Sequence, residues 1–208
     1  AHSDDEGLVL PPNLAPIQVV RVPIFRTDEE KAKVFDEAES IKKRLTSIGL
    51  SVKFDNRDTH KPGFKFAEWE LKGVPLRIGI GPRDVENKTV ELARRDTKTK
   101  SIVNNDELLE TVPKLMIEIQ NTMYQKALDF RNSNITEVNT WDEFVQVIEN
   151  KAGFVSAHWD GTGKDEEKIK ELTKATIRCI PLNNKQEEGK CVLTGSSSSQ
   201  RVLFAKAY

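Results

Sequence analysis

The 208-residue sequence has few cysteines, no long hydrophobic run and almost no net charge. The two cysteines, Cys179 and Cys191, are too few for the disulfide framework of a small secreted protein. Apolar runs are only strand-length, far short of the roughly 20 residues that a membrane-spanning helix needs. With 32 basic and 33 acidic residues, the overall charge gives no sign of nucleic-acid binding. We therefore expect a cytoplasmic protein without a membrane role, in which any surface for nucleic acid is local.

Strand and helix patterns alternate over the first half of the chain. Apolar, β-rich runs are separated by segments with helical spacing, the first of which can be capped by Asp28 and is stopped by Gly49. This order predicts an α/β fold, a mixed sheet flanked by helices, because each crossover helix must cover an apolar face of the sheet. The expected elements are a strand at 17–25, a helix at 28–48, a strand at 50–54, a helix at 64–71 and strands at 74–80 and 89–93.

A long amphipathic helix is expected from Asp106 to Phe130, with a smaller α+β domain beyond it. Pro113 is compatible with this helix only near its start or at a kink. Thr140, followed by two acidic residues, predicts the start of another helix. The remaining expected elements are a strand at 153–158, a helix at 164–172 and strands at 175–182 and 201–207.

Positive charge gathers locally between Arg57 and Lys100, where 11 basic residues accompany 7 acidic ones. Basic side chains in such a segment can hold phosphates and so position an RNA without reading its sequence. The alternative is an ordinary solvated helix and strand edge. The candidate phosphate contacts are Lys61, Lys65, Lys72, Arg94, Arg95 and Lys98.

The same segment contains residues suited to reading unstacked bases. Recognition of single-stranded RNA needs a flat group for stacking and polar groups for the base edge. A carboxylate can accept from N1 and N2 of guanine, and an arginine can donate to O6 and N7. Alternatively, Phe66 and Trp69 belong to the core and Glu70 forms a surface ion pair; we favour the core for Trp69 and leave Phe66 open. The candidate base contacts are Phe66, Glu70, Arg77, Arg83 and Asp84.

Several motifs in this chain resemble prolyl-tRNA synthetases of class II. RDTHKPGFKF at 57–66, EWE at 68–70, KGVPLR at 72–77 and GPRD at 81–84 are similar to the anticodon-binding domain of that family. HSDD and GLVLPP near the start resemble the stretch after its third class II motif. FAKAY at the end resembles the terminus of the archaeal and eukaryote-like branch. The resemblance therefore extends over the whole chain.

This resemblance implies that the chain is the C-terminal part of an enzyme that attaches proline to tRNA with ATP. It implies anticodon recognition of proline tRNA through the five base contacts, and no catalytic residue within the chain. ATP, magnesium and proline would bind to a missing catalytic domain, through which the full-length protein would form a homodimer. The implied segments are 1–16, the tail of the catalytic domain and a linker; 17–134, the anticodon-binding domain with the long helix; and 135–208, the terminal domain.

Two other functions remain to be weighed against tRNA recognition by part of a ligase. A free-standing accessory protein could bind tRNA or another synthetase without catalysis. A small-molecule α/β enzyme is disfavoured, since no nucleophile, base and orienting group stand together. His60 and His158 are isolated in the sequence, and for His60 we favour a loop or RNA-backbone contact.

The terminal domain of related synthetases holds a structural zinc with four cysteines, and this sequence departs from that pattern. A closed tetrahedral zinc site needs four Cys or His ligands, whereas only one of the matching positions is a thiol. We therefore predict no metal and expect Cys191 to be a small buried apolar residue. Tyr208 could lie against the catalytic domain, as the family's terminal tyrosine does, or close a strand. The four matching positions are Asp160, Asp165, Cys191 and Thr194.

Overall fold

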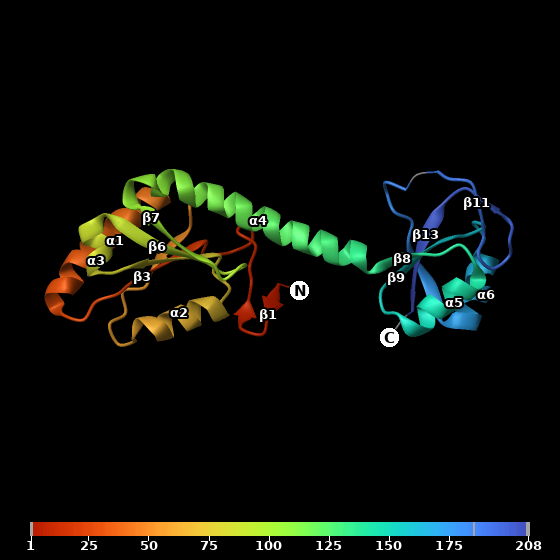
Figure 1. Ribbon diagram of the computed structural model, residues 1–208, viewed down its shortest axis with the longest axis horizontal. Coiled ribbons are helices and arrows are strands. Elements are labelled where there is room, and N and C mark those ends of the chain that lie inside the picture. Colours follow the sequence, from red (N-terminus) through yellow and green to blue (C-terminus); the bar gives the residue numbers. More distant parts are fainter. Residues whose placement is uncertain (1, 185, 207–208) are drawn as a thin grey trace. The chain divides into compact units, whose positions relative to one another are not determined.

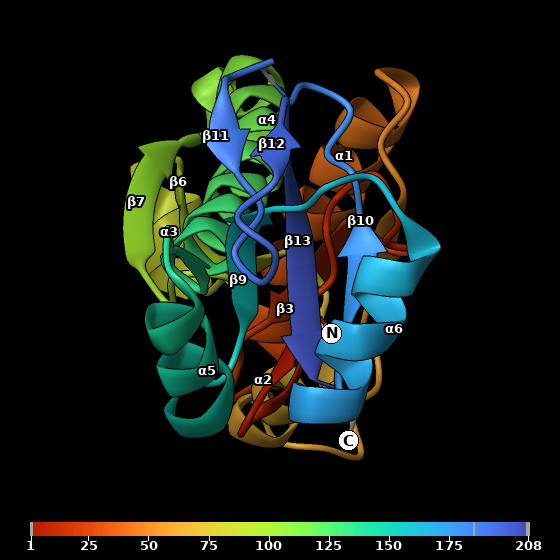
Figure 2. The same ribbon diagram turned by 90° about the vertical axis from the view of Figure 1, so that its right-hand side faces the viewer.

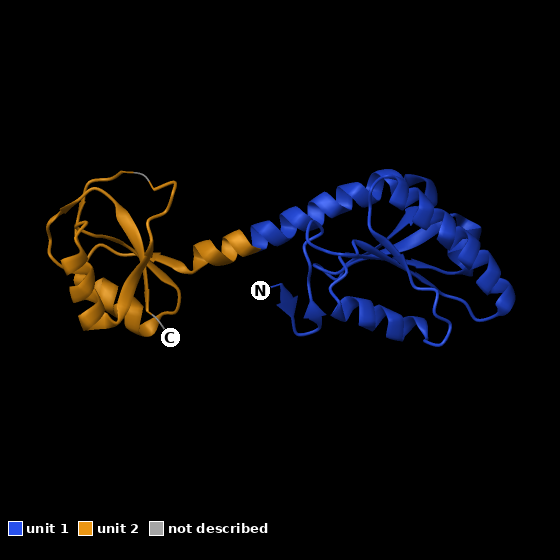
Figure 3. Cartoon of the chain, turned by 180° about the vertical axis from the view of Figure 1, so that it is seen from behind, with its two compact units in different colours: residues 1–126 blue, residues 127–208 orange. Residues whose placement is uncertain are grey.

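The computed structural model describes residues 2–184 and 186–206. The chain divides into two compact units, Ala1–Lys126 and Ala127–Tyr208, which Figure 3 shows in different colours. The division falls within the long helix α4 (Leu108–Ser133). Each unit has its own sheet and its own cluster of buried apolar side chains, so each has the core that a folding unit requires.

The first unit is built on a five-stranded mixed sheet with the order β4-β3-β5-β6-β7. Strand β3 pairs in parallel with β4 and β5, whereas β6 is antiparallel to both of its neighbours. The chain passes from β3 to β4 and then back to β5, so the two crossover helices cover opposite faces of the sheet. The strands are β3 (Val19–Pro23), β4 (Val52–Phe54), β5 (Leu76–Ile80), β6 (Thr89–Arg94) and β7 (Lys100–Asn104).

Helices cover both faces of this sheet, as Figure 1 shows with α4 and α2 on either side of the strands. Helices α1 and α4 pack against one face, where Leu76 and Ile78 are fully buried. Trp69 of α2 packs against Val20 and Val22 on the other face. The helices of this unit are α1 (Asp28–Ser47), α2 (Pro62–Leu71), α3 (Pro82–Asn87), a 3-10 turn (Asn105–Glu107) and α4.

The helix ends follow local sequence signals. The Thr27 hydroxyl accepts from the backbone of Glu30, and the Glu30 carboxylate accepts from the backbone of Thr27, which forms a capping box. The predicted cap, Asp28, is wrong by one residue, because it is the first residue of the helix itself. Gly49, with φ of +88°, follows the end of this helix as predicted. Thr140 caps α5 in the same way as Thr27, also as predicted.

Residues 2–10, which lie within the expected tail and linker at 1–16, include a short hairpin that belongs to the first compact unit. Strands β1 (Ser3–Asp4) and β2 (Gly7–Leu8) pair as an antiparallel hairpin. A Cβ atom on Gly73, which has φ of +72°, would lie 2.6 Å from the Cβ atom of Leu8. The hairpin therefore approaches the end of α2 as closely as glycine allows.

The second unit has a four-stranded sheet with the order β10-β13-β9-β8, and Figure 2 shows β10, β13 and β9 side by side. Phe144 of helix α5 and Ile169 of helix α6 pack against the same sheet face as Phe204, so both helices cover one face. The elements are β8 (Ile135–Glu137), α5 (Trp141–Asn150), β9 (Phe154–His158), α6 (Gly163–Thr173), β10 (Ala175–Cys179), β11 (Gly189–Lys190), β12 (Ser197–Ser198) and β13 (Arg201–Lys206).

The predicted fold class is confirmed, since mixed sheets are flanked by helices in both units. The long helix is also present, with Pro113 near its start as expected. Strands β7 and β8 were not predicted, and β10 ends at Cys179, earlier than expected. The architecture thus packs α2, which carries Phe66 and Glu70, against the face of the first sheet to which Arg77 of β5 belongs, whereas Arg83 and Asp84 lie on α3.

Candidate nucleic-acid interface

Three of the predicted base contacts come together where α2 crosses β5. The Arg77 guanidinium carbon lies 3.7 Å from the centre of the Phe66 ring, so the two flat groups are in contact. The Nε atom of Arg77 lies 4.0 Å from Oε1 of Glu70, and its Nη1 atom donates to Glu91 at 3.1 Å. Stacking plane, guanidinium and carboxylate thus lie within one small cluster, which we call the Arg77 cluster: Phe66, Glu70, Arg77 and Glu91.

Local sequence explains how these side chains meet. Pro62 opens α2, where its lack of an N–H costs nothing, and Phe66 and Glu70 lie four residues apart on the same side of the helix. The helix ends at Leu71, and the positive φ of Gly73 then turns the chain toward β5. Along β5, Arg77 points away from the buried Leu76 and Ile78, toward the side of the sheet that α2 covers.

Arg77 is largely shielded from water, with 5% of its side chain exposed. Its Nε atom is buried and has no hydrogen-bond partner among the residues that the structure describes. A buried donor without a partner costs free energy unless a ligand or water satisfies it. Arg77 therefore has donor capacity left over for a bound group.

Arg83 and Asp84 lie on α3, after the end of β5, and not in the Arg77 cluster. The Oδ2 atom of Asp84 accepts from the backbone N–H of Gly81 at 2.8 Å, so this carboxylate caps its own helix. Within the described residues, no hydrogen bond or ion pair joins either side chain to the cluster. The structure thus brings three of the five predicted base contacts together and leaves two at the neighbouring helix start.

Two of the predicted phosphate contacts, Lys61 and Lys72, are exposed at the two ends of α2. Lys72 pairs with Glu68 at 2.6 Å, and its ammonium lies 4.6 Å from the centre of the Trp69 ring. Exposed pairs of this kind are weak and exchange readily with other ions. These two lysines are therefore available to a phosphate.

Lys65 is different, because its side chain is buried. Its Nζ atom donates to the backbone oxygen of Asp55 at 3.3 Å and lies 3.9 Å from the Asp55 carboxylate. Burial lowers the pKa of Lys65, against which the charge of Asp55 acts. Lys65 lies one helical turn before Trp69, which the structure confirms as a core residue. An ammonium held inside the unit cannot meet a phosphate, so Lys65 does not belong to the interface.

Arg94, Arg95 and Lys98 are all held by carboxylates, Lys98 by Glu6 at 2.8 Å. Arg94 donates to Asp96 at 2.8 Å and also to Glu118, on the sheet face that α4 covers. Arg95 donates to both carboxylate oxygens of Asp4 and is itself buried. Its occupied, buried guanidinium argues against the predicted phosphate contact. The hydrogen bond from Arg95 also holds the pKa of Asp4 well below its usual range.

A small cavity of about 80 Å³ opens beside the Arg77 cluster. Basic side chains outnumber acidic ones around it, which suits an anionic ligand. Its lining residues are Glu6, Glu70, Arg77, Ala93, Arg94, Arg95, Lys98 and Lys100.

Sequence reasoning did not identify Glu91 or Asp4 as parts of this surface. Glu91 alternates with the buried Val90 and Leu92, a pattern that places it on the opposite side of the strand from the core. That periodicity was a usable signal for Glu91. No local pattern connects Asp4 with Arg95, because 91 residues separate them along the chain.

The two histidines considered for function have ordinary surroundings. His60 is exposed, stacks on Phe64 with ring centres 4.6 Å apart, and lies 2.8 Å from the hydroxyl of Thr59. His158 is buried between Ser198, at 3.1 Å, and Glu187, at 3.0 Å. The Ser198 hydroxyl is buried and donates to the backbone oxygen of Gln200 at 3.0 Å, so it does not donate to His158 as an activated nucleophile would.

Positions that match the zinc ligands of related synthetases form a hydrogen-bonded cluster in the second unit. Cys191 is buried, as predicted, and its Sγ atom donates to Asp165 at 3.1 Å. The backbone N–H of Thr194 donates to the same sulfur, whereas Asp160 accepts from Thr162. One thiol with two carboxylates and a threonine does not fit the closed site that structural zinc requires. In residues 2–184 and 186–206, no three His, Cys, Asp or Glu side chains form a group that could hold a metal.

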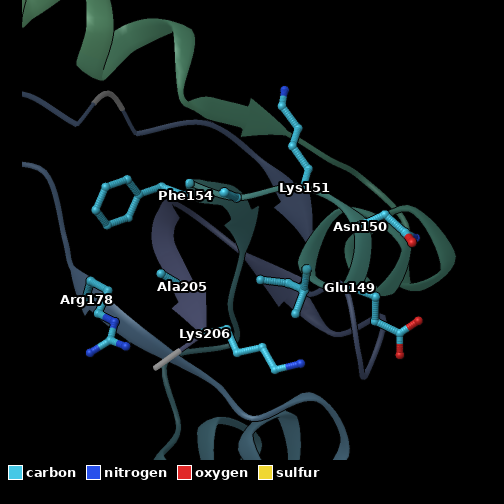
Figure 4. A pocket seen from close by; sticks show the side chains of 10 residues that line it. Glu149, Asn150, Lys151, Phe154, Arg178, Ala205 and Lys206 are labelled. Atoms are coloured by element: carbon cyan, nitrogen blue, oxygen red, sulfur yellow. The ribbon is translucent and has the colours of Figure 1, made fainter. Parts of the chain in front are cut away.

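A broad concavity of about 820 Å³ lies at one end of the sheet in the second unit (Figure 4). Phe154 and Arg178 lie on the left in this view, with Glu149 on the right. None of the predicted base or phosphate contacts lines it.

Tyr208 lies outside the described residues, so its predicted role stays open. Across the described residues, no helix is long and apolar enough to span a membrane.

Comparison with known proteins connects this geometry to a family. Residues 18–115 match the family described as "Anticodon binding domain", and residues 141–208 match "Prolyl-tRNA synthetase, C-terminal". Relatives named Proline--tRNA ligase are 61% identical in Flavobacterium psychrophilum, 59% in Christiangramia forsetii and 55% in Porphyromonas gingivalis. Each match covers 100% of this chain but 42% of the relative, so the chain spans less than half of their length. The chain belongs to the prolyl-tRNA synthetase family, as its anticodon-binding domain followed by its C-terminal domain.

Proposed function

We propose that the first unit reads guanine bases in the anticodon of proline tRNA through Phe66, Glu70 and Arg77. The observation that supports this most directly is the Arg77 guanidinium, held flat on the Phe66 ring with an unpartnered Nε atom beside Glu70. An arginine donates to O6 and N7 of guanine, and a carboxylate accepts from N1 and N2. The adjacent aromatic ring supplies a surface on which a splayed base can stack.

Arg83 and Asp84 complete the proposed interface from α3. Lys61 and Lys72 at the ends of α2 contact the backbone phosphates, which position the RNA without reading its sequence. Arg94 is not part of the proposed interface, because its bonds to Asp96 and Glu118 hold it on the sheet face that α4 covers. The interface thus combines a shielded site for the bases with exposed cations around it.

We also propose that the chain acts as part of a longer proline--tRNA ligase, as the names of its relatives suggest. The ATP-dependent attachment of proline, the binding of proline, ATP and magnesium, and the contacts of a homodimer then belong to a separate catalytic domain. The proposed location is the cytoplasm. Within this chain, the proposed contribution is recognition and not chemistry.

The test compares two steps of the ligase in variants of the protein that contains this chain. Glu70→Ala and Arg83→Ala should each lower aminoacylation of proline tRNA, by roughly tenfold or more for Glu70, since one good base contact is worth about 1–3 kcal/mol. Activation of proline, measured by ATP–pyrophosphate exchange, should hardly change. Glu110→Ala, which removes an exposed carboxylate from α4, serves as the control. Equal loss of both steps in the Glu70 variant would refute the assignment.

A further inference from the structure

Glu91 occupies a specific place in the sheet, directly opposite Gly79 on the neighbouring strand. Strands β5 and β6 are antiparallel, and Gly79 pairs with Glu91 in their register. Residues 77 and 79 of β5 point to the same face, because side chains alternate along a strand. Arg77, Gly79 and Glu91 therefore belong to one face of two adjacent strands.

The missing side chain of Gly79 leaves room for Arg77 and Glu91 to meet. A Cβ atom at position 79 would lie 3.4 Å from Nη1 of Arg77 and 3.6 Å from Oε1 of Glu91. A larger side chain would enter the space in which these two groups form their 3.1 Å hydrogen bond. Because Gly79 has no side chain, the Glu91 carboxylate of β6 can reach the Arg77 guanidinium of β5.

Contacts on several sides fix the guanidinium of Arg77. The Phe66 ring supports its flat side at 3.7 Å, and Glu91 accepts from Nη1. Glu70 lies 4.0 Å from Nε, too far for a hydrogen bond. Arginine carries five N–H donors in a rigid fork, so the bond to Glu91 fixes the orientation of the fork and leaves other donors free.

We propose that Glu91 is a positioning residue that orients Arg77 for guanine and so sets the base specificity of the interface. This inference rests on the proposed function, because it assigns to Glu91 the orientation of the arginine that reads the base. Without Glu91, Arg77 keeps its stacking on Phe66 but can rotate in the plane of the ring. Its donors then no longer point consistently toward O6 and N7.

Two other roles for Glu91 give different results. A carboxylate that contacts the RNA directly would act independently of Arg77. A carboxylate that only neutralises charge, for instance that of Lys100 at 3.7 Å, would alter affinity for every RNA alike. Only a positioning role makes the effect of Glu91 on base discrimination depend on Arg77.

The experiment measures binding of the 208-residue chain to two anticodon stem-loops, one with natural guanines and one with 7-deazaguanine, which lacks N7. The ratio of the two affinities reports the arginine contact, and it cancels general effects of charge. A bidentate arginine contact discriminates by roughly 5- to 150-fold, of which the N7 bond is one part. Arg77→Ala should lower the ratio of the two affinities to one, because no arginine then contacts N7. Glu91→Ala should lower it most of the way to one.

Glu91→Gln serves as the conservative variant, because it loses the charge but keeps an oxygen that accepts from Arg77. It should retain most of the ratio, because the loss of one negative charge changes the affinities for the two stem-loops alike and cancels in their ratio. In the double variant, Glu91→Ala should cause no further change in the ratio beyond that caused by Arg77→Ala. Glu110→Ala should leave the ratio unchanged, and thermal melting should confirm that each variant is folded.

The outcomes separate the inference from the proposed function. If Arg77→Ala leaves the ratio of affinities unchanged, Arg77 does not read the base. The proposed role of Glu91 is then wrong as well. If Arg77→Ala abolishes the ratio but Glu91→Ala leaves it intact, the inference alone is overturned. If Glu91→Ala lowers affinity for both stem-loops when it is added to Arg77→Ala, Glu91 contacts the RNA directly and the positioning role is overturned.

Discussion

The two units each bury an aspartate, and their surroundings differ. Asp55, after β4 in the first unit, has 1% of its side chain exposed and accepts from Arg57 and from Trp69, each at 2.8 Å. Asp165, on α6 in the second unit, is also buried but accepts from the weak thiol donor of Cys191. Its Oδ1 atom has no hydrogen-bond partner among the described residues. One carboxylate is fully paired, and the other is only partly satisfied.

The pKa values of the two carboxyls shift in opposite directions. Burial raises the pKa of Asp55, but hydrogen bonds from Arg57 and Trp69 outweigh it and hold the pKa well below its usual range. Burial also raises the pKa of Asp165, and the hydrogen bond from Cys191 offsets this only in part. Desolvation acts alike on both groups, so the partners decide whether a buried charge stabilises a unit or costs it stability.

The largest expected effect comes from breaking the paired cluster. Asp55→Ala should destabilise the first unit by about 3–5 kcal/mol, because it leaves the buried Lys65 without its counter-charge. The folded-state pKa lies below the unfolded value of about 3.9, so the stabilisation is present above that pH and is lost as the pH falls below it. Calorimetry from about pH 7 down to about pH 2 measures this dependence.

Asp58→Ala is the control for the Asp55 variant. Asp58 is exposed and forms its ion pair with Lys31 at 3.1 Å, so its removal should cost less than about 1 kcal/mol. Similar losses in the two variants would show that burial and pairing of Asp55 are not what stabilises this unit.

A smaller effect of the opposite sign is expected from Asp165→Asn. Asparagine removes the charge and keeps a carbonyl that can accept from Cys191. The pKa of Asp165 lies above the unfolded value, so the ionised carboxylate costs stability as the pH rises through that window. The variant should be more stable near neutral pH by on the order of 1 kcal/mol, and this gain should shrink toward pH 4.

Peptide-level hydrogen exchange locates the effect of Asp165→Asn. Increased protection should appear in α6 and the neighbouring strands of the second unit and not in the first. A loss of protection at neutral pH would mean that the carboxylate stabilises the second unit, and the contrast between the two aspartates would disappear.

The smallest effect on stability is expected for exposed pairs at four-residue spacing. Lys72→Ala and Lys114→Ala each remove such a pair, with Glu68 and Glu110 respectively, and should cost less than about 0.5 kcal/mol. Binding of proline tRNA should separate them, because Lys72 is a proposed phosphate contact and Lys114 is not. Loss of Lys72 should lower the slope of log affinity against log salt by about one. Equal slopes for both variants would exclude Lys72 from the interface.

Much of the fold could be predicted from the sequence, because periodicity and helix caps are local. The helix at Thr140 and the core position of Trp69 both follow from patterns a few residues long. Strand β7 was missed because Lys100–Asn104 is short and mostly polar, and it occupies the edge of the sheet. Edge strands of this kind carry little of the hydrophobic pattern on which prediction relies.

The site was harder to predict, because its partners come from distant parts of the chain. Lys65 looked like any basic residue of a positive segment, although its spacing of four from Trp69 places it on the buried side of α2. Its position inside the unit depends on Asp55, which arrives from the loop after β4. Glu91 could have been assigned to a strand face, but not to Arg77, without the register of β5 and β6.

The hairpin at the start of the chain bears on how this protein can be dissected. Pro11 and Pro12 look like a natural place to trim the gene, since they precede the first strand of the large sheet. Trimming there would remove Asp4 and leave the buried Arg95 guanidinium without its salt-bridge partner. Arg95 also donates from Nε to the backbone oxygen of Glu70 at 2.9 Å. Displacement of Arg95 would therefore remove a contact that holds the C-terminal end of α2. A recombinant version meant to preserve RNA recognition should therefore begin ahead of Ser3.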